Sequence, residues 1–195
     1  MSIQNESTLA KGFNPDQPRA ANGQFGSGEG HSAVPTADER ATGPKDFGSP
    51  EANALVRSWT TAGGSTQMDE AKMKQMTDLV KQQGEKGDGR PQYRGISLNE
   101  DQFNRMMSEY KSKSFVDLPA TSFTTDRDTA QIYSESGARS VMVTILGGEN
   151  RFLDVSSFAA ENGFYESERV TAGRFRVIDV SQGRDGSATM SLWAA

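Results

Sequence analysis

The sequence predicts an α+β domain, with helices packed on a mostly antiparallel sheet, preceded by a segment that stays disordered. Three observations lead to this prediction. Residues 1–48 lack the apolar side chains of a core, the residues after them carry apolar side chains at helical spacing, and the second half of the chain alternates with the strand period. Helices first and strands later favour antiparallel pairing.

The first 48 residues differ in composition from the rest of the chain. They contain seven glycines and four prolines but only Ile3, Leu9 and Val34 as large aliphatic side chains. Such a segment buries too little apolar surface to offset the entropy of ordering its backbone, roughly 1–2 kcal/mol per residue. We therefore expect residues 1–48 to be a low-complexity segment that is disordered or weakly attached, and residues 49–195 to form one domain.

Three helices are predicted in the first part of this domain. Residues 51–60 form the first, and residues 66–83 form an amphipathic second with lysines away from its apolar face. The third begins after Asn99, because Gln102 stands three residues later and completes a capping box. Its apolar face has the spacing i, i+3, i+4 and i+7 and consists of Phe103, Met106, Met107 and Tyr110.

The second part of the domain changes to the strand period. Alternating apolar residues predict strands over 141–146, 152–155, 175–180 and 189–193. A short helix over 126–135 precedes them, and a glycine ends it.

Composition excludes several kinds of chemistry. The chain of 195 residues has no cysteine and one histidine, so a thiolate nucleophile, a disulfide framework and a multi-histidine metal site are excluded. Its net charge of −5 argues against a protein held to nucleic acid mainly by phosphate contacts. No apolar run has the length of a signal peptide or a membrane span. We expect a protein without a metal, a membrane anchor or an export signal of its own.

Three short elements carry residues suited to chemistry. Arg94 ends a predicted strand, Ser122 lies in a Thr-Ser-Phe-Thr run, and Glu166 and Glu168 form a Glu-x-Glu motif. Each has a plain structural interpretation when taken alone, as a rim arginine, a strand serine and a solvated acidic face. On a strand, however, residues i and i+2 point to the same side, so the two carboxylates would share one pocket.

These residue types together suit cleavage at an anomeric carbon. Carboxylates can stabilise an oxocarbenium-like transition state and hold a sugar hydroxyl, and a guanidinium fork suits phosphate oxygens. NAD offers both, since its nicotinamide–ribose bond is N-glycosidic and lies next to a diphosphate. Neither a Rossmann fingerprint nor a P-loop is present, so NAD would be a consumed substrate and not a hydride carrier.

The order of an aromatic-Arg strand, a Ser-centred strand and a Glu-x-Glu element resembles the mono-ADP-ribosyltransferases of the Arg-Ser-Glu class. Residues 54–73, ALVRSWTTAGGSTQMDEAKM, are similar to the helical stretch before the arginine strand of that family. Residues 164–180, FYESERVTAGRFRVIDV, are similar to its final motif. The middle motif departs from the more common Ser-Thr-Ser. The resemblance spans about residues 50–180 and implies helices on a split sheet.

The resemblance also implies a role for each residue. Arg94 would contact the NAD phosphates, and Ser122 would order the pocket by hydrogen bonding near Glu168. Glu168 would bind the 2′-hydroxyl of the nicotinamide ribose and steady the oxocarbenium. Glu166 would position and help deprotonate the nucleophile, and a glutamate at that place accompanies arginine as acceptor.

Four neighbours of these residues complete the predicted site. Gly95 and Thr121 flank Arg94 and Ser122 in the cofactor-binding part. Phe164 and Tyr165 lie in the turn that meets the target protein in this family, so we assign them to acceptor recognition, with core or hinge aromatics as the alternative.

The function predicted from the sequence is transfer of ADP-ribose from NAD to an arginine on a host or target protein. We expect a toxin-like effector, either encoded by a bacteriophage and carried in a virion or delivered by a bacterium, that acts in the cytoplasm of the host or target cell. Three alternatives remain open: an RNA or DNA acceptor, hydrolysis of NAD, and a catalytically inactive virion or interaction protein.

Overall fold

The computed structural model describes residues 43–61, 68–135, 138–163 and 167–194. Its helices are α2 (Pro50–Thr61), α3 (Glu70–Gln83), α4 (Glu100–Ser112), α5 (Arg127–Ser134) and α6 (Ser156–Glu161). Its strands are β1 (Glu85–Lys86), β2 (Gln92–Leu98), β3 (Phe115–Thr124), β4 (Arg139–Ile145), β5 (Arg151–Asp154), β6 (Glu168–Gln182) and β7 (Ala188–Ala194).

The seven strands of the described residues form one sheet in which two strands distant in the order, β6 and β7, also pair with each other. Their order is β1-β5-β6-β3-β2-β4-β7. Every pair is antiparallel except β4 with β7, which confirms the predicted α+β fold class. β2 and β3 share a single register pair, Tyr93 with Thr124, so the sheet is split between these two strands.

β6 joins the two parts of the sheet. Its first part lies between β5 and β3, whereas its second part pairs with β7 from Phe175 to Gln182. Gly173 stands between the two parts with φ +138°, and the register of the facing β3 shifts between Leu118 and Thr121. Side chains other than glycine rarely adopt that φ, so the strand changes direction at this glycine.

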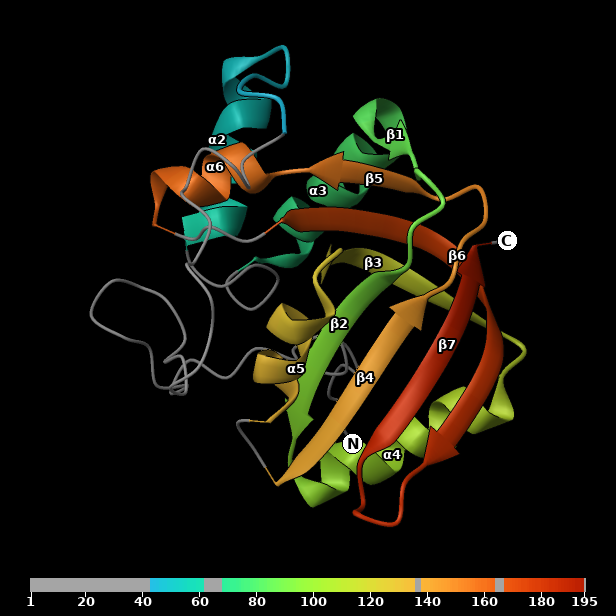
Figure 1. The fold of residues 1–195 in the computed structure, drawn as a ribbon. Coiled ribbons are helices and arrows are strands. Elements are labelled where there is room, and N and C mark those ends of the chain that lie inside the picture. The colour runs from blue at the N-terminus through green and yellow to red at the C-terminus, as the bar shows by residue number, and fades with distance from the viewer. Residues whose placement is uncertain (1–42, 62–67, 136–137, 164–166, 195) are drawn as a thin grey trace, which may run out of the picture.

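Two hydrophobic clusters correspond to the two parts. One lies between α4 and the strands β2, β3, β4 and β7. The other lies beneath α2, α3 and α6 and contains Val56, Trp59, Met76, Phe158 and Val170. Figure 1 shows α2, α3 and α6 gathered near β5 and the start of β6, and α4 at the opposite end. Within the described residues, no helix is long and apolar enough to cross a membrane.

The predicted elements occur with changed boundaries. The capping box of α4 is present, since Asn99 Oδ1 accepts from Gln102 N and Gln102 Oε1 accepts from Asn99 N. The helix predicted from residue 66 begins at Glu70, because the Asp69 side chain caps it by accepting from Lys72 N. The short helix α6 and strand β1 were not predicted, because neither is long enough to show a period.

The folded part extends further toward the N-terminus than residue 49. Phe47 is 4% exposed, and its ring stacks on Phe158 at 5.3 Å between centroids. Gly43 N donates to Ser156 Oγ, and Ser157 Oγ donates to Gly43 O. Residues 43–48 thus pack on the domain ahead of the predicted boundary at residue 49, whereas residues 1–42 lie outside the described part.

Candidate active site

Arg94 lies where the sheet splits. Beyond the Tyr93–Thr124 pair, β2 and β3 are no longer paired, and Arg94 Nη1 donates to the main-chain carbonyl of Ser122 at 2.9 Å. The guanidinium thus supplies a donor to a strand carbonyl that β2 does not reach. The guanidinium also lies within electrostatic reach of Tyr110, Glu168 and Tyr133.

Ser122 and Glu168 are joined directly. Ser122 Oγ donates to Glu168 Oε1 at 2.6 Å, a length typical of a hydroxyl bound to a carboxylate. The β3–β6 register produces this contact, since Thr124 faces Glu168 and Ser122 faces Val170 on the adjacent strand. The structure therefore brings together three residues that the sequence singled out, Arg94, Ser122 and Glu168.

Trp59, a residue of the predicted helix over 51–60, also belongs to this cluster. Its indole Nε1 donates to Ser122 Oγ and to Glu168 Oε1, both at 3.1 Å. The side chain is fully buried in the cluster beneath α2. A buried tryptophan usually finds a hydrogen-bond partner for its N–H, but the sequence does not indicate which one.

The surroundings shift the protonation of both charged groups. Burial raises the pKa of Glu168 above its ordinary value of 4.5, against the opposing effects of the Ser122 and Trp59 hydrogen bonds and the Arg94 charge. Burial likewise lowers the pKa of Arg94, although a guanidinium stays charged at neutral pH. Arg94 and Glu168 act on each other through space and through Ser122, without a direct ion pair.

Two predicted neighbours have other partners in the structure. A Cβ built on Gly95 would lie 1.7 Å from the Ala130 carbonyl oxygen, so the absence of a side chain lets α5 approach β2. Thr121 Oγ1 donates to the carbonyl of Pro119 at 2.7 Å. A cofactor contact for Gly95 and Thr121 stays a prediction.

Three predicted residues, Phe164, Tyr165 and Glu166, lie outside the described residues. β6 begins at Glu168, and Ser167 precedes the strand. The strand geometry used to place both carboxylates on one side therefore does not extend back to Ser167, and it cannot be used to place Glu166.

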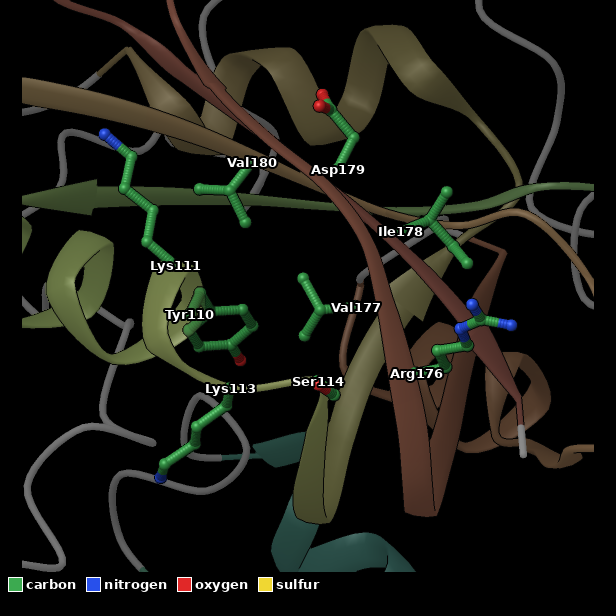
Figure 2. A pocket seen from close by; sticks show the side chains of 9 residues that line it. All are labelled: Tyr110, Lys111, Lys113, Ser114, Arg176, Val177, Ile178, Asp179 and Val180. Carbon is green, nitrogen blue, oxygen red and sulfur yellow. The ribbon is translucent and has the colours of Figure 1, made fainter.

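A hollow of about 370 Å³ lies elsewhere, between the end of α4 and the second part of β6 (Figure 2). Its lining is rich in cations and contains none of the four clustered residues; it consists of Tyr110, Lys111, Lys113, Ser114, Arg176, Val177, Ile178, Asp179 and Val180. Among the described residues, no group of three or more potential ligands could hold a metal ion.

The cluster can bind a ligand through two separate groups. Glu168 Oε1 is occupied by two donors, whereas Oε2 accepts no hydrogen bond from the described residues. A carboxylate oxygen can accept from a hydroxyl, and a guanidinium suits an anion.

No protein-family model matches the chain, and no curated protein matches it. Its fold is similar to that of several ADP-ribosyltransferases. The Vis enzyme in complex with agmatine is 12% identical with a TM-score of 0.48, over 82% of this chain and 80% of that one; Vis is a toxin from Vibrio splendidus. HopU1 of Pseudomonas syringae pv. tomato is 17% identical with a TM-score of 0.45, over 74% of this chain and 65% of that one. Exoenzyme S from Pseudomonas aeruginosa is 14% identical with a TM-score of 0.42, over 75% and 68%.

Proposed function

We propose that the protein is a mono-ADP-ribosyltransferase that transfers ADP-ribose from NAD to an arginine side chain of a target protein. The observation that carries the proposal is the Ser122–Glu168 contact of 2.6 Å, with the Arg94 guanidinium bound to the main-chain carbonyl of the same serine. These are the three residues, in the same chain order, on which the resemblance to the Arg-Ser-Glu class rests.

The proposed chemistry needs no metal and no covalent intermediate. The C–N bond between nicotinamide and ribose C1′ breaks, and its electron pair leaves with nicotinamide. A lone pair of the acceptor guanidine nitrogen forms the new C–N bond at C1′, and the acceptor loses one proton. Glu168 Oε2 binds the ribose 2′-hydroxyl and stabilises the positive charge on the sugar, while Arg94 binds the phosphates. Glu166 takes the proton from the acceptor.

Incubation of the full chain with labelled NAD tests the proposal. Agmatine serves as a small guanidine acceptor and a bacterial lysate as a source of protein acceptors, with nicotinamide release followed by chromatography. We expect wild type to release one nicotinamide for each labelled acceptor. Asp179→Ala, which removes an exposed carboxylate on the same strand, should give the same result. We expect neither nicotinamide nor labelled acceptor for Glu168→Ala. Equal labelling by wild type and Glu168→Ala would contradict the assignment.

The same experiment separates the alternatives. Label removed by nuclease treatment would indicate a nucleic-acid acceptor, and nicotinamide release without labelled acceptor would indicate NAD hydrolysis. Absence of NAD binding in calorimetry would favour an inactive interaction protein. Mass spectrometry of labelled lysate proteins identifies the target. A phage origin and action in the cytoplasm of a host cell remain part of the proposal.

A further inference from the structure

We propose that Trp59 is a positioning residue for Glu168: its indole N–H anchors Oε1, so that Oε2 is the oxygen presented to substrate. This inference rests on the function proposed above and adds a residue from α2 to the site. It also divides the carboxylate into an anchored oxygen and a working oxygen.

The geometry fixes the indole. Trp59 is 0% exposed and lies in the cluster with Val56, Met76 and Phe158, so its ring is held by packing on α2, α3 and α6. Its N–H is a donor only and is shared between Ser122 Oγ and Glu168 Oε1, each 3.1 Å away. Because the ring is rigid and packed, the donor stays in place when the substrate binds.

The hydrogen bonds around Glu168 are asymmetric. Oε1 accepts from the Ser122 hydroxyl at 2.6 Å and from the indole, whereas Oε2 accepts nothing from the described residues. Ser122 alone could follow the carboxylate, since a hydroxyl rotates to suit its acceptor. The indole cannot follow, so it determines which rotamer of Glu168 has both donors satisfied. In that rotamer Oε1 receives both donors, and Oε2 is the oxygen that would accept from a sugar hydroxyl.

The indole also acts on the charge of Glu168. Donors to a carboxylate favour its ionised form. The pKa of Glu168, raised by burial, is held down by Ser122, Trp59 and the charge of Arg94 on β2, while Asp154 on β5 raises it. Loss of the indole N–H should therefore raise this pKa further and move the acid limb of the pH–rate profile to higher pH.

The chain offers a matched control, because it contains two tryptophans. Trp193 is 47% exposed on β7, where it pairs with Arg176 in the second part of β6. In Trp193→Phe, Trp59 is the only tryptophan, so growth on benzothienylalanine replaces the Trp59 N–H with sulfur and keeps the ring shape. Trp59→Phe in the wild-type background is a second variant. The sulfur analogue keeps the experiment decisive if Trp59→Phe does not fold.

We expect kcat for nicotinamide release to fall by about tenfold to a hundredfold with the sulfur analogue, which corresponds to loss of a hydrogen bond to a charged group. KM for NAD should change little, and the acid limb should move up in pH. Trp193→Phe should match wild type in all three. Unchanged kcat and an unchanged acid limb in the sulfur analogue of an active enzyme would overturn the inference.

A second readout needs no activity. The fluorescence of Trp193→Phe comes from Trp59 alone and should titrate with a midpoint above 4.5, the ordinary pKa of a glutamate. Glu168→Gln in that background should abolish the titration. If Trp193→Phe titrates but releases no nicotinamide, the proposed function fails while the contact stands. If the titration survives Glu168→Gln, the contact itself is wrong.

Discussion

The two parts of β6 belong to one strand but have different surroundings. The first part begins at Glu168, between β5 and β3, and its carboxylate is bonded to a serine and a buried indole. The second part pairs with β7 and lines the open hollow of Figure 2, where Asp179 and Ile178 are exposed. An acidic residue on each part therefore has a different capacity for chemistry.

The difference shows what a strand needs to become part of a site. Charge is not the limiting factor, because Lys111, Lys113 and Arg176 line the hollow around Asp179. The two carboxylates differ in their neutral donors, since Glu168 is bound by a serine hydroxyl and a buried indole. The indole comes from α2, and burial beneath the helices raises the pKa of the Glu168 carboxyl group. The helices at one end of the sheet thus distinguish the two parts.

Replacing an arginine with lysine, once in the candidate site and once in the hollow, should give the largest difference in activity. Arg94→Lys removes the guanidinium fork, which binds the Ser122 carbonyl and in the proposed function also binds the NAD phosphates. We expect kcat/KM for NAD to fall by about 10- to 150-fold, the equivalent of about 1.5–3 kcal/mol for hydrogen bonds to a charged group. For Arg176→Lys, in the hollow, kcat/KM for NAD should stay within about twofold of wild type, because substitutions at exposed positions usually have small effects. Steady-state nicotinamide release measures both, and equal losses would show that the hollow takes part in the reaction.

Gly95→Ala tests the close contact between α5 and β2, next to Arg94 in the chain. The added methyl group would meet the Ala130 carbonyl at 1.7 Å, which is backbone and cannot rotate away. We expect the free energy of unfolding to fall by about 1–3 kcal/mol or more, as for other overpacked positions. Urea unfolding measures it.

Gly87→Ala is the matched control for this prediction. Its methyl group would meet the edge of the Phe152 ring at 3.2 Å, a side chain that can shift slightly. A loss equal to that of Gly95→Ala would mean that α5 does not press on β2 as closely as described.

The sequence predicted the local features of the fold because local interactions determine them. The Asn99–Gln102 capping box and the apolar face of α4 need only neighbouring residues. The length of β6 could not be predicted in the same way. The strand predicted over 175–180 runs from Glu168 to Gln182, because pairing on both sides carries it through Gly173, a residue that usually interrupts a strand.

Three residues of the site could be predicted from the sequence, but the contact of Trp59 with two of them could not. Arg94, Ser122 and Glu168 follow from residue types in a telling order, and the β3–β6 register then brings Ser122 to Glu168. Trp59 has the appearance of any apolar residue on an amphipathic helix. Its contact depends on how α2 packs over the sheet, which no local pattern specifies.

The stability of the site should depend on pH through Glu168. In the folded protein, burial raises the pKa of this carboxyl group above 4.5. At a pH between the pKa of Glu168 in the unfolded chain and its higher pKa in the folded protein, the folded state binds more protons than the unfolded state. The free energy of unfolding therefore falls as the pH rises through that window. Glu168→Gln has no such cost and keeps an acceptor for Ser122 and Trp59. We expect its Tm to exceed that of wild type by a few degrees at neutral pH.

That advantage should disappear below pH 4.5, where the glutamate is protonated in both states. Thermal melts at several pH values measure the difference, and roughly 2–4 °C corresponds to 1 kcal/mol in a domain of this size. Asp179→Asn, on the exposed part of β6, is the control and should give a constant small difference. A Glu168→Gln advantage that is independent of pH would mean that relief of crowding, and not of charge burial, is responsible.

Asn99→Ala should give the smallest effect and should separate stability from chemistry. It removes the acceptor for Gln102 N at the start of α4, the helix that borders the hollow. Loss of a cap costs about 1 kcal/mol, so Tm should fall while nicotinamide release at 25 °C stays at the wild-type rate. Asn99→Ser keeps a capping oxygen and should restore the Tm. Tyr110 on α4 lies within electrostatic reach of Arg94. A fall in kcat with Asn99→Ala, restored by Asn99→Ser, would therefore show that α4 is coupled to the site through Arg94.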